Sequence, residues 1–182
     1  LLEKKGNEIL LTSKGKQLLE LVPEDLKKPE LTASWEMELA KIAKGAHKEQ
    51  IFIRMVFNYV AGISDDHNKN ISFIMDKTGA WRLSPAYDVM FTANTWENSS
   101  AHIHSMGVMG KRSALTTSDF VNFAEDFVEE PEKKILQVFD AVSRFQSLCV
   151  KYGIDKAISD KIQHVLEGLV IDDLNLLESR KQ

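Results

Sequence analysis

The stretch from residue 51 to residue 88 constrains the fold of this chain more than any other segment. Apolar side chains recur at helical spacing over residues 51–60, which predicts an amphipathic core helix. Loop-forming residues then occupy 62–70, and a change to strand-like alternation on both sides of Gly79 predicts a β-hairpin over 71–83. The loop is therefore expected to lie between a core helix and a hairpin.

Asp65 and Asn70 stand five residues apart in this loop. A protein-kinase catalytic loop has the same offset between the Asp that takes the hydroxyl proton and the Asn that holds a magnesium ion. Asp88 ends the sequence Pro-Ala-Tyr-Asp after the hairpin and can supply a second carboxylate. Alone, an Asp and an Asn at this spacing are more often part of a solvated turn. The flanking helix and hairpin favour a phosphotransfer site, with Asp65 as the base and Asn70 and Asp88 as magnesium ligands.

Three further loop residues have competing interpretations. Lys69 can place a cation beside the transferring phosphoryl group, or it is a solvated loop lysine. His67 can face a nucleotide phosphate, or it braces the loop by hydrogen bonding. Asp66 must point away from Asp65 along an extended segment, so we expect it to cap a loop or to contact a helix.

Several segments resemble a known family, the HipA-family serine/threonine kinases, which are the toxins of toxin–antitoxin pairs. The segments that closely resemble the C-terminal lobe of these kinases are 57–62, 65–72 and 83–88. The segment 104–112 is also similar to the family's H-x-M-S-x-N-G-K-R pattern, except that Gly107 and Met109 replace the Ser and the Asn. These departures remove polar side chains from the substrate side of the cleft.

The resemblance covers about residues 47–182 and implies ATP and Mg²⁺ as cofactors, a protein substrate phosphorylated on Ser or Thr, and an antitoxin as a candidate partner. It places Tyr87 at the nucleotide site, although the same ring could instead pack beneath the loop. It also explains His104 as part of the loop beside the active site, which we prefer to transition-metal binding by His102 and His104. The predicted nucleotide-binding residues are His67, Lys69, Asn70, Tyr87 and Asp88.

The first third of the chain resembles a different family, the type IA DNA topoisomerases. The similar segments are 10–19, 23–26, 29–36 and 42–45. They look like a part of such enzymes from downstream of the catalytic tyrosine. Tyr59, Tyr87 and Tyr152 are the three tyrosines of the chain, and all lie inside the kinase-like region. We therefore expect no DNA strand cleavage by this chain alone.

These patterns predict a mainly α (α+β) protein in two parts. Residues 47–182 form a helical kinase-like C-terminal lobe with one embedded β-hairpin, and residues 1–46 form a small helical, winged-helix-like appendage. The appendage contains a hairpin over 1–11 and two helices, which Pro23 and Gly45 end. The remaining expected helices span 120–128 after a cap at 117–119, then 131–153 and 156–177 with Ile158 inward, and the expected core includes Trp35, Trp81 and Cys149.

Composition limits the partners and the location. The chain has 182 residues and a net charge of −4, so no overall basic field draws it to nucleic acid. The nine lysines up to Lys48 are nearly balanced in charge by eight acidic residues in the same segment. DNA binding is therefore a minority hypothesis. The single cysteine excludes an internal disulfide. No apolar run reaches the roughly 20 residues that span a bilayer and no signal-peptide pattern opens the chain, so we expect no membrane partner and a cytoplasmic location.

The predicted function is the catalytic, magnesium-binding half of a HipA-like serine/threonine kinase. The residues ahead of Asp65 show neither the Gly-rich loop nor the strand lysine that the N-terminal lobe of a kinase supplies. We therefore expect the isolated chain to be inactive unless a separate N-terminal lobe is provided. Two alternatives stay open, namely a non-catalytic module that binds a protein partner or DNA, and a topoisomerase fragment with a kinase-like tail.

Overall fold

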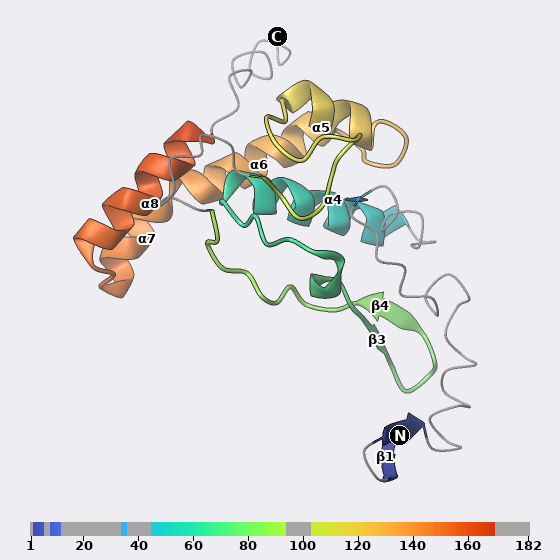
Figure 1. The fold of residues 1–182 in the computed structure, drawn as a ribbon. Coiled ribbons are helices and arrows are strands. Elements are labelled where there is room, and N and C mark those ends of the chain that lie inside the picture. Colours follow the sequence, from blue (N-terminus) through green and yellow to red (C-terminus); the bar gives the residue numbers. More distant parts are fainter. Residues whose placement is uncertain (1, 6–7, 12–33, 36–44, 94–102, 170–182) are drawn as a thin grey trace.

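The structure is a computed structural model that describes residues 2–5, 8–11, 34–35, 45–93 and 103–169. Its elements in chain order are β1 (Leu2–Lys5), β2 (Glu8–Leu11), α4 (Gly45–Val60), the 3-10 turn η1 (Asn68–Asn70), β3 (Phe73–Met75), β4 (Trp81–Leu83), α5 (Thr117–Ala124), α6 (Pro131–Ser143), α7 (Phe145–Tyr152) and α8 (Lys156–Gly168). Figure 1 shows the helices gathered together and the β3–β4 hairpin projecting from them. The predicted mainly helical fold with an embedded hairpin is confirmed.

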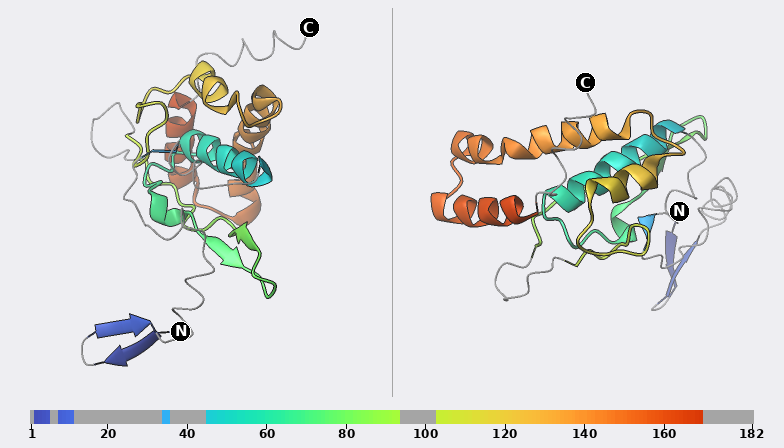
Figure 2. Two further views of the ribbon diagram at one scale, coloured as in Figure 1. Left: turned by 90° about the vertical axis from the view of Figure 1, so that its right-hand side faces the viewer. Right: turned by 90° about the horizontal axis from the view of Figure 1, so that it is seen from above.

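Helix α4 is the centre of the hydrophobic core. Ile51, Phe52, Met55 and Val56 are all buried, and their spacing of three and four residues makes one face of the helix apolar. This face packs against α6, and the right-hand view of Figure 2 shows the two helices running alongside each other. Burial of one such side chain stabilises a fold by about 1.5–3 kcal/mol. With four of them, α4 contributes strongly to the stability of the helical part.

The β3–β4 hairpin has the position and the turn that the sequence predicts. Its strands are antiparallel, with Phe73 opposite Leu83. The turn closes on the Asp76 carboxylate, which accepts hydrogen bonds from the Thr78 hydroxyl and from the backbone N–H groups of Thr78 and Ala80. These bonds, led by that from the Thr78 hydroxyl, lower the pKa of Asp76. Gly79 supplies the positive φ of 86° that the turn requires.

Residues from the first third of the chain reach the same core. Trp35 is buried and belongs to the core cluster that includes the α4 residues, as predicted for this tryptophan. Its backbone N–H donates to the carbonyl oxygen of Gly107 at 2.9 Å, next to a bridge between Ser34 and Gly107. Further towards the N-terminus, β1 and β2 form the predicted hairpin, with Leu2 opposite Leu11.

Helix α5 begins earlier than the sequence predicts. We expected a cap at 117–119 and a helix over 120–128, but the helix spans Thr117–Ala124 and its N-cap is Thr116. The reason is a capping box, in which the Thr116 hydroxyl accepts from the Asp119 N–H and the Asp119 carboxylate accepts from the Thr116 N–H. The pair is reinforced by Lys111, whose ammonium lies 2.7 Å from Asp119.

The predicted helix over 131–153 is two helices, α6 and α7, which break at Arg144. The Ser143 hydroxyl donates to the carbonyl oxygen of Asp140, and a serine that bonds its own backbone in this way competes with helix continuation. Helix α8 is described as far as Gly168, so its predicted extension to 177 lies largely outside the described residues. Ile158 was expected to face inward, but it is 55% exposed, and Leu166 is the buried apolar residue of this helix.

The other expectations have mixed outcomes. Cys149 is buried, as predicted, whereas Trp81 is only half-buried. The two helices expected before Gly45 lie almost wholly outside the described residues, as does His102. No helix in the part of the chain that the structure describes is long and apolar enough to cross a membrane.

The capping box at Asp119 predicts a pH dependence of stability. Burial favours the neutral acid, but hydrogen bonds from Lys111 and Thr116 outweigh it and lower the pKa of Asp119 below its ordinary value. A group with a lowered folded-state pKa stabilises the fold above its unfolded pKa, near 4, and loses that effect as the pH falls through the folded value. We therefore expect Asp119→Asn to cost about 1 kcal/mol at pH 7 and less near pH 3. Urea unfolding at both pH values measures this, and an equal cost at both would contradict it.

Candidate active site

The loop between α4 and β3 is held in place by contacts with the segment 91–93. Gly62 has a φ of 67°, and a Cβ at this position would lie 2.8 Å from the Phe91 ring, so only glycine fits there. The Gly62 carbonyl oxygen accepts from the backbone N–H groups of Thr92 and Ala93. The Thr92 hydroxyl also accepts from the Asp65 N–H at 3.0 Å. The backbone of Asp65 is thereby tied to the 91–93 segment.

The Asp65 side chain points outward, and 62% of it is exposed. Asn70 braces the loop from within, since its side-chain Nδ2 donates to the Asp65 carbonyl oxygen at 3.2 Å. The Ser105 hydroxyl donates to the Asp65 carboxylate at 3.5 Å, and His67 Nε2 lies 3.9 Å from the same oxygen. A carboxylate that is accessible and placed beside a hydroxyl has the setting that a general base needs.

Asp66 points the other way, as the sequence predicts, and the structure shows that it is buried. Its Oδ1 accepts from the backbone N–H groups of Ser105 and Met106 at 2.8 and 3.2 Å, and its Oδ2 lies 3.0 Å from His104 Nδ1. The expected role of Asp66 as a loop cap is confirmed. Because a buried carboxylate is stable only when donors surround it, these bonds tie the 104–106 segment to the loop over residues 62–70.

His104 lies in the loop beside the site, where the resemblance placed it. Its ring is buried and stacks on Tyr59, with centroids 4.9 Å apart. The Tyr59 hydroxyl accepts from the Leu115 N–H at 2.8 Å, and burial raises the pKa of Tyr59. The described residues, which do not include His102, contain no group of three His, Cys, Asp or Glu side chains that could hold a metal ion.

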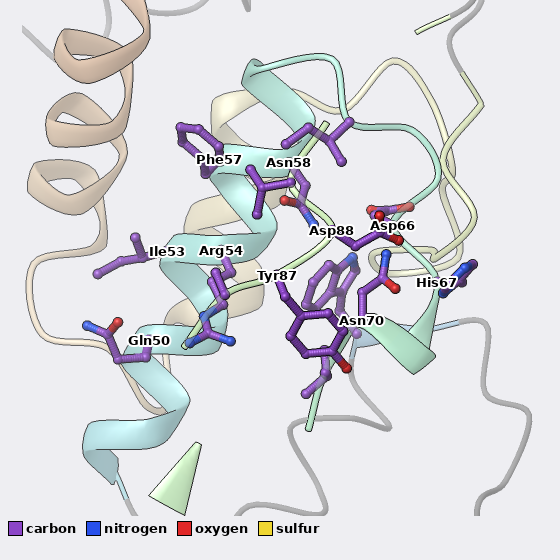
Figure 3. Close-up of a pocket in the computed structure, with 15 residues that line it drawn as sticks. Gln50, Ile53, Arg54, Phe57, Asn58, Asp66, His67, Asn70, Tyr87 and Asp88 are labelled. Atoms are coloured by element: carbon purple, nitrogen blue, oxygen red, sulfur yellow. The ribbon is translucent and has the colours of Figure 1, made fainter. Parts of the chain in front are cut away.

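A cavity of about 360 Å³ opens between α4, the loop and the segment after β4 (Figure 3). The residues that line it are Trp35, Gln50, Ile53, Arg54, Phe57, Asn58, Ile63, Asp66, His67, Asn70, Ile71, Ala86, Tyr87, Asp88 and Val89. It therefore brings together four of the predicted nucleotide-binding residues, from both sides of the hairpin. Asp65 and Lys69 are outside this lining, and both are exposed.

Tyr87 and Asp88 enter the cavity from the segment after β4. The Tyr87 hydroxyl donates to the carbonyl oxygen of Lys69 at 2.5 Å, which connects this segment to the turn that carries Asn70. The residue is 42% exposed, so Tyr87 is not simply a packed aromatic beneath the loop. Asp88 has a φ of 54°, a left-handed conformation that is uncommon outside glycine and that clusters at functional sites.

Asn70 and Asp88 are the residues that could hold a magnesium ion. Magnesium takes oxygen ligands and commonly uses only one or two protein groups, with water and phosphate completing its shell. The Asn70 amide nitrogen is engaged with Asp65, which leaves the amide oxygen as the group available to a cation. Both side chains line one cavity, so the donor set fits magnesium.

Sequence reasoning missed three polar residues on α4. Gln50, Arg54 and Asn58 lie four residues apart, line the cavity and form one polar stripe on a helix whose other face is buried. Arg54 donates from Nη2 to the Ser84 carbonyl oxygen, and the Ser84 hydroxyl in turn accepts from Ser72. Their regular spacing was a signal in the sequence, but a polar stripe on a helix is usually its solvated side.

Comparison with known proteins identifies two separate similarities. The model of one family, described as HipA-like C-terminal domain, matches residues 15–148, which include every predicted site residue. This match begins ahead of the predicted boundary between residues 46 and 47, which stays a prediction. The second similarity is to bacterial proteins named DNA topoisomerase 3.

The topoisomerase matches are close but short. The protein of Bacillus licheniformis is 61% identical over 59 residues, which are 32% of this chain and 8% of the topoisomerase. That of Bacillus subtilis is 63% identical over 54 residues, or 30% and 7% of the two chains. That of Bacillus thuringiensis is 54% identical over 63 residues, or 35% and 9%. The chain thus spans less than a tenth of the length of these relatives.

The buried Asp66 predicts a large effect of a single substitution. Asp66→Ala would leave the N–H groups of Ser105 and Met106 without their acceptor in a buried setting. We expect a loss of about 3 kcal/mol or more of unfolding free energy, because each such orphaned group costs about 1–3 kcal/mol. Chemical denaturation measures it, with Asp126→Ala at an exposed position as the control. Equal stability of the two variants would contradict the role given to Asp66.

Proposed function

Because the chain belongs to the family of HipA-like C-terminal domains, we propose that it is the catalytic, magnesium-binding half of a serine/threonine kinase that uses ATP. The observation that supports this most is that the predicted base and the predicted metal ligands lie on different sides of the loop. Asp65 turns its carboxylate outward, while Asn70 and Asp88 both line the adjoining cavity. Phosphoryl transfer needs a base for the acceptor hydroxyl on one side and ligands for a cation on the other.

In this proposal Asp65 accepts the proton of the substrate hydroxyl. Its backbone is held by Thr92 and Asn70, which fixes the position from which the carboxylate extends towards the substrate. Exposure of the carboxylate suits a protein substrate, because a serine or threonine on another chain has to reach it.

Asn70 and Asp88 would hold magnesium. When bound there, the ion would neutralise charge on the nucleotide phosphates and orient them. The protein's own contribution is the placement of the two oxygen donors. The hydrogen bond from Tyr87 to the Lys69 carbonyl oxygen joins the segment of Asp88 to the turn of Asn70, and so sets the relative position of the two ligands.

His67 and Tyr87 would contact the nucleotide from the wall of the cavity. His67 has a buried Nδ1 with no hydrogen-bond partner among the described residues, which makes it available to a ligand. Lys69 is exposed and outside the lining, so its ammonium would act only on a part of the ligand that extends out of the cavity.

A second polypeptide surface would complete the site. Tyr87, Val89 and Met90 are 42, 48 and 60% exposed, and they lie together at the segment that borders the cavity. An N-terminal lobe, from a separate chain or a longer form of this one, would cover them and enclose the nucleotide. An antitoxin protein is the other partner that the family relationship suggests.

The topoisomerase similarity supports a second candidate function. Identity of 61% over 59 residues suggests that this part of the chain keeps a surface of the DNA topoisomerase 3 fold. If that surface binds single-stranded DNA, the affinity should fall steeply with salt and should be lost on deletion of residues 1–46. Affinity that is insensitive to salt, or unchanged by the deletion, would remove this candidate.

The kinase proposal predicts how the isolated chain and a complete enzyme behave. We expect nucleotide affinity in the millimolar range and no detectable turnover from the isolated chain, because an open half-site buries little of the ligand. A complete N-terminal lobe should restore phosphorylation of Ser or Thr. In that enzyme, Asp65→Asn should lower the rate by roughly 10²–10⁴-fold because it removes the base.

The measurement is transfer of labelled phosphate from ATP to a protein substrate. Asp126→Asn, at an exposed position outside the cavity lining, is the matched control and should keep the full rate. A normal rate in Asp65→Asn would show that the assignment of the base is wrong.

A further inference from the structure

The cavity contains a cationic residue that the proposed mechanism does not use. Arg54 lies on α4 between Gln50 and Asn58, and all three side chains line the cavity. Figure 3 shows Arg54 extending from the helix towards the segment that carries Tyr87 and Asp88. It is therefore placed across the cavity from the proposed magnesium ligands rather than on the outer surface.

Only one arm of the Arg54 guanidinium has a partner. Nη2 donates to the Ser84 carbonyl oxygen, whereas Nη1 is buried and has no hydrogen-bond partner among the described residues. None of the ion pairs within those residues involves Arg54. Burial lowers the pKa of Arg54, which indicates that its surroundings solvate the charge poorly. An arginine stays charged in proteins, and Nη1 of this one has no acceptor among the described residues.

The carboxylates in the cavity do not supply an acceptor for Nη1. Asp66 already accepts from Ser105, Met106 and His104. Asp88 is exposed and forms no ion pair with any residue that the structure describes. The cavity thus presents one uncommitted cation and one uncommitted carboxylate at different places on its wall. A ligand that carries both a metal ion and anionic oxygens matches this arrangement.

We infer that Arg54 binds a phosphate group of the ligand in this cavity through Nη1, while Nη2 stays on Ser84. This rests on the proposed function, which provides a nucleotide with phosphates to bind. A guanidinium is suited to the task, because its two arms have fixed directions and its hydrogen bonds to phosphate are charge-assisted. Arg54 also positions the site, since its bond to Ser84 holds the segment that leads to Tyr87 and Asp88.

The test uses the full chain and inorganic tripolyphosphate without magnesium, so that binding does not depend on Asp88 as a metal ligand. Titration at constant ionic strength, followed by ¹⁵N NMR, should shift the Arg54 Nε resonance with millimolar affinity. Arg54→Gln keeps a donor for Ser84 but loses the charge, and should weaken binding about tenfold. Arg54→Lys keeps the charge and should lose less. Arg82→Gln, on the exposed face of β4, should bind like the unchanged protein.

Three outcomes would overturn the inference. The first is a folded Arg54→Gln protein that binds tripolyphosphate as well as the unchanged protein does. The second is an Arg54 Nε resonance that does not move, and this result decides the matter even if Arg54→Gln does not fold. The third is binding of malonate, a dicarboxylate, as tight as that of tripolyphosphate. This result would show that the site takes a carboxylate ligand rather than a phosphate. None of these outcomes involves Asp65 or phosphoryl transfer, so the proposed kinase function would fail separately, in the Asp65→Asn assay.

Discussion

The buried carboxylate of Asp66 is the interaction on which the site depends. It lies inside the fold with three donors from the 104–106 segment, a stretch 38 to 40 residues away in sequence. A carboxylate that lost these donors would be strongly destabilising in this setting, so the loop and the distant segment hold one another in place. Along the extended chain the neighbouring side chain must point the opposite way, and for this reason Asp65 faces solvent.

Helix α4 has two functions because its two faces differ. Its apolar face builds the core with α5 and α6, and Tyr59 on the same helix supports His104 beneath the site. Its polar stripe forms one wall of the cavity, and Arg54 on that stripe holds the segment after β4. A substitution in the core of α4 would therefore disturb the cavity as well as the stability.

The contact between Trp35 and Gly107 bears on how the two similarities coexist in one chain. Trp35 lies within the first third, which resembles a topoisomerase, yet it packs in the core of the kinase-like part. The family match likewise begins at residue 15. At least this part of the first third is thus integrated in the fold around the site.

Local sequence patterns determined the core helix, the β3–β4 hairpin and the opposite directions of the Asp65 and Asp66 side chains. These features follow from helical periodicity, strand alternation and turn chemistry, which act over a few residues and can be read along the chain. Their limit is visible at Arg144 and Thr116, where hydrogen bonds of single hydroxyl groups moved the helix ends. Only the tertiary structure decided that Asn70 and Asp88 share a cavity while Lys69 stays outside it. It also decided the partners of Asp66 and Arg54, because packing chooses which distant backbone groups reach a buried charge, and no local pattern encodes that choice.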